Sequence, residues 1–192
     1  MRIATGLTIA VHLAVLAGTL VCQEPVATTL TCHVRGSQQW LATRPSPLDS
    51  AVVTVAQARA KICYSRPSAR GRSVDSLVPS GRAWRLGANE PSTIMLTDSL
   101  DIGGAVLPQG RYVILAVPGP ERWMLVFHTT PDTEPAKMFR SLRTVATGTG
   151  RVERVGEPLE QFGIRAEADS AGPVLLLEWG TWRVRVPVRA SH

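Results

Sequence analysis

The sequence predicts a mainly β protein: an antiparallel β-sandwich, or alternatively a partly open barrel, with one long irregular arginine-rich loop and at most one or two short helices. From residue 92 onward, short apolar segments alternate with turn signals containing Gly and Pro, a spacing typical of sandwiches and barrels. Near the C-terminus, Trp182, Val184 and Val186 alternate with Arg183 and Arg185, which is the period of a half-buried strand. With 192 residues, 44% of them hydrophobic, the chain is long and apolar enough for one domain with its own core.

Residues 1–22 have the composition of an export signal. Arg2 is followed by an apolar run with small residues near its end, as in a secretory signal peptide, and Ala17 suits a signal peptidase. A lipoprotein signal with a lipid on Cys22 is a second interpretation, although Val21 is not the small residue usually found before such a cysteine. A retained membrane anchor is a third, because the run is near spanning length. We expect an extracytoplasmic protein, periplasmic or secreted, that contacts a membrane only through this signal or lipid anchor.

Residues 23–47 are rich in Thr, Pro, Ser and Gln without a sustained period, which predicts a flexible arm or linker. The chain has three cysteines, and thiols outside the cytoplasm tend to pair. If Cys22 is cleaved off or lipidated, Cys32 and Cys63 are left as an even number. We therefore predict a Cys32–Cys63 disulfide, with two unpaired thiols as the alternative.

Residues 48–190 form the single predicted β-sandwich domain. Its first long strand is predicted over 51–64, because apolar residues alternate there with Arg59 and Lys61. Gly103-Gly104 between apolar flanks predicts a hairpin turn, since both glycines tolerate a positive φ. Buried strands are predicted over 111–117 and 123–128.

The C-terminal part of the domain contains one predicted helix and four further strands. Residues 134–145 are predicted as a short helix, because Met138, Phe139 and Leu142 would share one face. Two glycine-containing segments, Gly148-Thr149-Gly150 and Gly180-Thr181, are predicted as turns. The predicted strands cover residues 151–155, 159–168, 174–179 and 182–188.

Charge and motifs narrow the classes of partner. The formal net charge is +6, but no block of Lys and Arg occurs, so we expect no nucleic-acid partner. The positive net charge is compatible with an anionic small molecule or a glycan as the partner. The sequence contains no HExxH, CxxC, GxSxG or phosphate-binding loop motif, so we expect no metal and no cofactor.

The irregular segment 62–90 holds the side chains best suited to binding. Arginine presents a planar fork for carboxylates or phosphates, and a tryptophan ring can stack on a ligand. The predicted ligand-binding residues are Tyr64, Arg66, Arg70, Arg72, Trp84, Arg85, Asn89 and Glu90. The alternative is structural: Glu90 pairs with Arg66 or Arg85 and fixes the loop to the sandwich.

This segment also carries a family resemblance. Residues 64–72 (YSRPSARGR), 77–79 (LVP) and 84–90 (WRLGANE) resemble the signature of a bacterial family known as domain of unknown function 2911. The resemblance covers about residues 51–188 and implies an exported domain with no established activity. Ser80 and His128 stand where the family usually has Tyr and Asn, so a pocket that uses those positions would differ in this chain.

Three functions stay open at this point. The first is non-catalytic binding of an anionic or carbohydrate-like ligand in the cell envelope, through the residues of the arginine-rich loop. The second is a hydrolase-like enzyme with Glu90 or His128 as the general base. The third is a structural or protein-interaction module.

Overall fold

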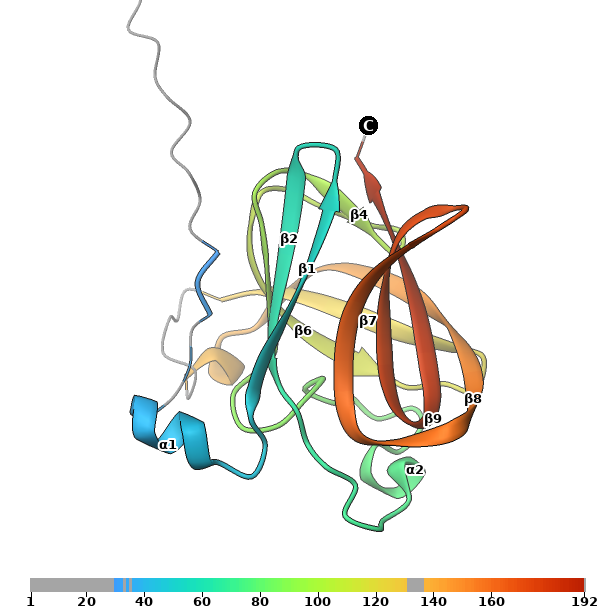
Figure 1. Cartoon of the computed structure of the whole chain (residues 1–192). Helices are drawn as coiled ribbons and strands as arrows, with labels where there is room; N and C mark the ends of the chain where they lie inside the picture. The colour runs from blue at the N-terminus through green and yellow to red at the C-terminus, as the bar shows by residue number, and fades with distance from the viewer. Residues whose placement is uncertain (1–29, 33, 35, 131–136, 192) are drawn as a thin grey trace, which may run out of the picture.

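The computed structural model describes residues 30–32, 34, 36–130 and 137–191, and strands make up most of it (Figure 1). Within these described residues, two short α-helices and one 3₁₀ turn accompany nine strands. The helices are α1 (Gln38–Thr43) and α2 (Val74–Leu77), and the 3₁₀ turn is η1 (Met138–Arg140). The strands are β1 (Leu48–Val55), β2 (Ala58–Ser65), β3 (Thr93–Leu96), β4 (Leu100–Ile102), β5 (Ala105–Leu107), β6 (Gly110–Val117), β7 (Arg122–Thr129), β8 (Arg143–Asp169) and β9 (Gly172–Ala190).

The nine strands form one antiparallel sheet in the order β1-β2-β3-β6-β7-β8-β9-β4-β5, and this sheet is not closed into a barrel. The sheet curls so strongly that β1 comes close to β8 and β9 (Figure 1). Both sides of the core are therefore parts of a single sheet. The predicted mainly β, antiparallel fold is confirmed.

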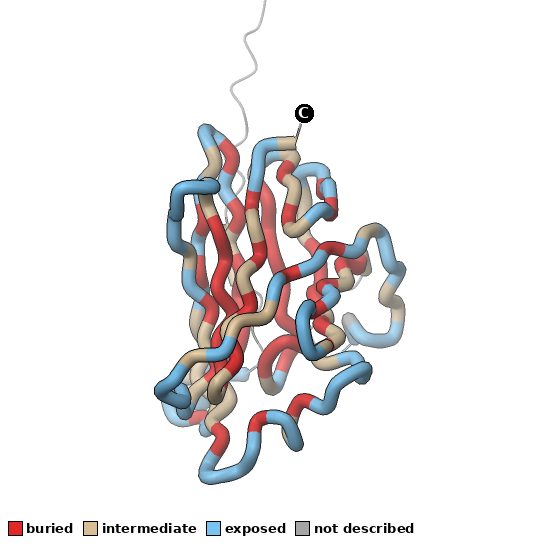
Figure 2. Tube along the Cα trace, turned by 90° about the vertical axis from the view of Figure 1, so that its right-hand side faces the viewer, coloured by how far each residue is buried: buried red, intermediate tan, exposed pale blue. Residues whose placement is uncertain are grey.

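The core lies inside the curl, and alternating side chains build it. On β7, Trp123, Leu125 and Phe127 are buried in the core, whereas Met124 between them points outward and is exposed. Figure 2 shows buried residues concentrated along the strands and exposed residues along the connections. The alternation of hydrophobic residues along the sequence therefore indicates which side chains face the core.

The first predicted strand, 51–64, is wrong as a single element, because it contains most of the hairpin of β1 and β2. Val55 pairs with Ala58, and Ala56 between them has a φ of 52°, in the left-handed region. Ala and Gln at positions 56 and 57 carry no turn signal, and this is why the sequence pattern did not show the turn.

Strands β8 and β9 form a two-stranded ribbon that bends sharply near the lower end of the molecule in Figure 1. Arg154 pairs with Trp182 and Leu159 with Gly180, so residues 155–158 of β8 stand opposite Thr181 alone. Surplus residues on one strand bend a ribbon towards the other strand. The inner strand β9 makes its bend at Gly180, which has a φ of 56°.

This ribbon corrects four predicted strands and two predicted turns. The strands expected at 151–155 and 159–168 are parts of β8, and those at 174–179 and 182–188 are parts of β9. Residues 148–150 lie within β8, where a Cβ on Gly148 would be 2.3 Å from the Ile102 carbonyl oxygen. Gly148 therefore permits close packing of strands, and Gly180 bends a strand without ending it.

The helix predicted at 134–145 is also wrong. Only η1 is helical among its described residues, and β8 already begins at Arg143. The first residues of that predicted helix, 134–136, lie outside the described part of the chain.

Two contacts fasten the residues before β1 to the domain. Cys32 and Cys63 form the predicted disulfide, with their Cα atoms 5.6 Å apart. Arg44 is buried and donates hydrogen bonds to Glu90 Oε1 and Ser65 Oγ, both at 2.8 Å. The expected flexible arm, 23–47, thus contains α1 and a side chain buried in the domain.

Residues 1–22, including Cys22, lie outside the described residues. Within the described ranges, the helices are too short to cross a membrane.

The long segment between β2 and β3 covers one end of the curled sheet (Figure 1). Its residues Ala69, Val74, Val78 and Leu86 are buried in the core. Trp84 also exchanges backbone hydrogen bonds with Ala116 of β6, at 2.7 and 2.8 Å. The predicted irregular loop is therefore packed onto the sheet at separate points, with exposed residues between them.

Candidate functional site

The structure does not bring the eight predicted binding residues into one cleft. Some of them are buried in the interior, and the others are distributed over separate parts of the surface.

Glu90 is buried in the interior, and Trp84 is partly buried against the core. Glu90 accepts hydrogen bonds from Arg44 at 2.8 and 3.1 Å, and the side chains of Arg44 and Glu90 are 0% and 4% exposed. Glu90 does form an ion pair that fixes the loop to the sheet, as the structural alternative predicted. Its partner, however, is Arg44 and not Arg66 or Arg85. Trp84 stacks on Trp179 with ring centroids 5.8 Å apart and meets the edge of Phe162 at 5.0 Å.

Tyr64 is buried and closes a gap between β2 and β8. Its hydroxyl accepts a hydrogen bond from the Ile164 N–H at 2.8 Å and lies 3.1 Å from both Ile164 O and Asp49 Oδ2. Burial raises the pKa of Tyr64 to about 12, so this side chain stays protonated near neutral pH. The Tyr64 hydroxyl therefore has a structural role: it provides a hydrogen-bond acceptor for the Ile164 N–H of β8.

Replacing Tyr64 with phenylalanine is therefore expected to destabilise the fold by about 1–3 kcal/mol, because the buried Ile164 N–H loses its acceptor. Tyr112→Phe is the matched control, since the Tyr112 hydroxyl donates a single hydrogen bond, to Pro108 O at 2.9 Å. Urea unfolding of both variants measures the difference. A Tyr64→Phe variant no less stable than Tyr112→Phe would contradict this role.

Arg66 lies at a shallow depression of about 270 Å³. The charged side chains around this depression form ion pairs with one another. Its guanidinium is 3.6 Å from Asp49 Oδ2. On the other side of the depression, Glu178 accepts hydrogen bonds from Arg165 and Arg183 at 2.7 and 2.6 Å. Burial acts to raise the pKa of Glu178, but these two arginines outweigh it and hold the pKa below its usual range.

Arg85 and Asn89 are exposed on the last part of the loop, before β3. Arg85 donates to the Asn89 carbonyl at 2.9 Å, and its guanidinium lies 5.3 Å from the centre of the Phe139 ring. Asn89 donates through its side chain to the Ser46 carbonyl at 3.2 Å.

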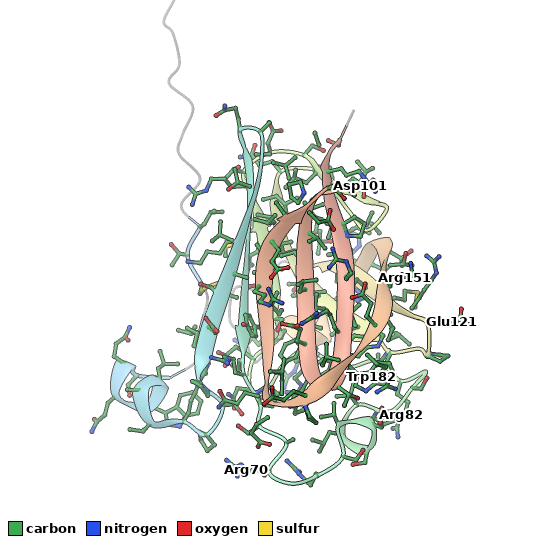
Figure 3. The ribbon with its side chains drawn as sticks, turned by 45° about the vertical axis from the view of Figure 1, so that its right-hand side comes forward. Arg70, Arg82, Asp101, Glu121, Arg151 and Trp182 are labelled. Carbon is green, nitrogen blue, oxygen red and sulfur yellow. A yellow bond between two sulfur atoms is a disulfide. The ribbon has the colours of Figure 1, made fainter. Side chains whose placement is uncertain are left out.

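Arg70 and Arg72 belong to the part of the loop that lies beside a second site, which we call the ribbon-bend cleft. The cleft has a volume of about 390 Å³ and lies between loop residues 69–75 and the bend of the β8–β9 ribbon. Figure 3 shows Trp182 at this end of the sheet and Arg70 on the loop beyond it. Its lining is Ala69, Gly71, Arg72, Ser73, Val74, Asp75, Pro158, Leu159, Glu160, Gly180, Thr181 and Trp182.

The local sequence explains why a cleft forms here. Val74 of α2 packs against the bend, where a Cβ on Gly180 would lie 2.8 Å from Val74 Cγ2. Ala69 donates its N–H to the Glu160 carbonyl at 2.9 Å, so the loop follows the edge of β8 before turning away. The loop and the bend thereby form two walls with a gap between them.

Each wall contributes a carboxylate that the protein holds in place through one oxygen. Asp75 Oδ1 accepts a hydrogen bond from the Trp182 indole N–H at 2.7 Å, and Glu160 Oε1 accepts one from the Arg70 N–H at 2.7 Å. The second oxygen of each carboxylate has no hydrogen-bond partner among the described residues. The cleft thus presents two oriented acceptors.

Further polar groups surround these acceptors. Arg154 donates to Thr181 Oγ1 at 2.9 Å, and its guanidinium stacks 3.5 Å above the Trp182 ring. Arg72 donates from Nε to the Ala69 carbonyl at 3.0 Å.

Sequence reasoning missed most of this cleft. Of its lining, only Arg72 was predicted as a binding residue, and the important residues Asp75, Glu160 and Trp182 were not. Asp75 and Trp182 are 107 positions apart, and neither stands in a motif, so no local signal joins them.

His128, the second candidate base, is buried at the end of β7. Its Nδ1 lies 3.2 Å from Thr144 Oγ1, and burial lowers its pKa. Among the described residues, no group of three His, Cys, Asp or Glu side chains is arranged to hold a metal ion.

The comparisons with known proteins identify a family. A family model described as "Protein of unknown function (DUF2911)" matches residues 46–188, which is more than half of the chain. No curated protein and no solved structure matches the chain. The match spans the domain from just before β1 almost to the end of β9, and the chain therefore belongs to the DUF2911 family.

Proposed function

We propose that this domain acts outside the cytoplasm as a binding protein for an uncharged, hydroxyl-rich ligand of the carbohydrate class, held in the ribbon-bend cleft. The observation that carries the proposal is the pair of carboxylates, Asp75 and Glu160, each fixed through one oxygen with the other oxygen available to a ligand. Carboxylate oxygens are strong acceptors for hydroxyl groups.

The charges favour an uncharged ligand over an anion. Arg66 and Arg165 are already paired with Asp49 and Glu178. At the cleft, the two carboxylates of Asp75 and Glu160 balance the charges of Arg72 and Arg154, and Arg154 lies 4.0 Å from Asp75, so these four groups carry no net positive charge to attract an anion. Of the two ligand classes expected from the sequence, the glycan is therefore the better supported.

The size and lining of the cleft suit one or two sugar rings. Small-molecule sites occupy about 300–1,000 Å³, and this cleft falls at the lower end of that range. Ser73 and Thr181 add hydroxyl groups, and the exposed side chain of Leu159 adds an apolar surface for the C–H face of a sugar.

The extracytoplasmic part of the proposal rests on two features. The Cys32–Cys63 disulfide is of a kind that persists in oxidising compartments and is rare in the cytosol. The composition of residues 1–22 predicts export.

The structure favours binding over the hydrolase alternative. A general base must come within hydrogen-bond reach of its substrate. Glu90 is buried with both carboxylate oxygens engaged by Arg44, and His128 is buried as well.

The test is a screen of neutral and anionic oligosaccharides by thermal shift, followed by calorimetry on wild type, Asp75→Asn and Glu160→Gln. Each amide keeps one oxygen for its protein N–H but replaces the second acceptor with a donor. We expect neutral glycans to stabilise the wild type, and each variant to bind about 3–10 times more weakly.

Asp101→Asn is the matched control. Asp101 Oδ1 accepts a hydrogen bond from the Gly104 N–H at 2.6 Å, and Figure 3 shows Asp101 at the opposite end of the molecule from Trp182. Equal losses in Asp75→Asn and Asp101→Asn, or stabilisation by anionic sugars alone, would contradict the proposal.

A further inference from the structure

A second surface, independent of the cleft, joins α1 to η1 through the turn at residues 85–89. The Arg85 guanidinium stacks on Phe139 of η1, and the same side chain donates to the Asn89 carbonyl. Asn89 in turn lines a hollow of about 480 Å³ together with Gly36, Ser37 and Trp40. We call this surface, made of Trp40, Arg85, Asn89, Phe139 and Arg140, the aromatic–basic face.

Helix α1 presents its side chains to solvent. It has six residues, QQWLAT, and none of them is buried. A helix this short is marginal in water without packing, yet this one is held at both sides by the Cys32–Cys63 disulfide and the Arg44–Glu90 ion pair. The disulfide and the buried ion pair therefore hold in place a helix whose Trp40 side chain is exposed.

The aromatic–basic face combines exposed aromatic rings with positive charge. Trp40 and Phe139 are 41% and 40% exposed. Arg85 and Arg140 are exposed, and so is Arg143 just after η1. Among the described residues, α1, the turn at 85–89 and residues 137–143 contain no acidic side chain.

We propose that the aromatic–basic face binds the surface of an anionic phospholipid bilayer. Tryptophan and phenylalanine partition into the headgroup region of a membrane, and each arginine near an anionic surface strengthens binding about fivefold. Both kinds of contact are available here on one face.

In the lipoprotein and retained-anchor interpretations of the N-terminal segment, this face would lie close to a membrane. The apolar run of residues 3–22 is predicted to enter or attach to the bilayer during or after export. Cys32 is fastened to β2, so the residues between Cys22 and Cys32 span at most about 35 Å. In those two interpretations, the aromatic–basic face would add a second membrane contact to the one made by the N-terminal segment.

Tryptophan fluorescence of the full chain tests the proposal directly. All five tryptophans are described, and Trp40 alone belongs to the exposed large hydrophobic residues. Vesicles that contain phosphatidylglycerol with brominated acyl chains should shift Trp40 emission to the blue and quench it. Trp40→Phe should remove this change even if the N-terminal segment still holds the protein on the vesicle.

Affinity measurements then separate the contributions of the face. We expect Trp40→Ala to weaken binding about five- to tenfold, Arg140→Ala about fivefold, and added salt to weaken it further. Met124→Ala is the matched control, since Met124 is also 41% exposed but lies on β7, and it should bind as the wild type does.

Three results would overturn the proposal. One is unchanged Trp40 emission on vesicles that carry the protein, and another is equal quenching by phosphatidylcholine vesicles. The third is a concentration-dependent blue shift without vesicles, which would assign the face to a second copy of the chain.

Discussion

Replacing Arg44 with alanine is expected to lower the free energy of unfolding by about 3–5 kcal/mol, because it leaves the Glu90 carboxylate buried and without a counter-charge. The Arg44 and Glu90 side chains are 0% and 4% exposed, and their closest approach is 2.8 Å. Ser65 Oγ, which receives a hydrogen bond from the same guanidinium, loses that donor too. Urea-induced unfolding followed by tryptophan fluorescence measures the change.

The control for this prediction is Arg66→Ala. Arg66 is also paired with a carboxylate, Asp49, but at 3.6 Å and with both side chains more than a third exposed. Exposed ion pairs contribute only about 0–1 kcal/mol, so this variant should unfold almost as the wild type does.

A double variant tests whether the uncompensated charge of Glu90 causes the loss of stability. In Arg44→Met/Glu90→Gln no buried charge remains, and most of the stability lost in Arg44→Ala should return. Equal losses in Arg44→Ala and Arg66→Ala would show that the buried pair does not fix the loop.

Removing the disulfide in Cys32→Ala/Cys63→Ala is expected to destabilise the domain by about 3–4 kcal/mol. The two cysteines are 31 positions apart, and the loss of this cross-link raises the conformational entropy of the unfolded chain. The measurement is again urea unfolding, carried out with and without a reducing agent.

Reduction supplies the control for the disulfide. Reduced wild type should unfold at the same urea concentration as the double alanine variant, and the variant itself should not respond to the reductant. If reduction of the disulfide does not change the stability of the wild type, the prediction is contradicted.

The fold was predictable in outline because strand patterns are local. The alternation of Trp123, Leu125 and Phe127 with outward residues, and the hairpin at Gly103-Gly104, follow from the geometry of extended chains. The disulfide could be predicted because only Cys32 and Cys63 remain once Cys22 is assigned to the export signal.

The predictions failed where the signal was absent or ambiguous. The turn at Ala56-Gln57 uses residues that rarely mark turns. Glycine has the opposite ambiguity, because it serves equally in a turn, at the bend of β9 and at the close packing of Gly148 against Ile102.

The candidate site was harder to predict than the fold. Part of the arginine-rich loop forms one wall of the ribbon-bend cleft, and Arg72 lines that cleft. The other predicted side chains are used mainly for packing and for pairing within the protein. Their residue types suit binding and structural roles equally well, so composition could not distinguish the two.

The sequence by itself determined that this chain is a mainly β domain with an irregular arginine-rich loop, because hydrophobic period and turn residues act over a few neighbouring positions. Only the tertiary structure decided that Glu90 pairs with Arg44, 46 positions away, and that Asp75 meets Trp182 at the bend of the ribbon. Those contacts depend on how one continuous sheet curls and where its last ribbon bends, and no local pattern carries that information.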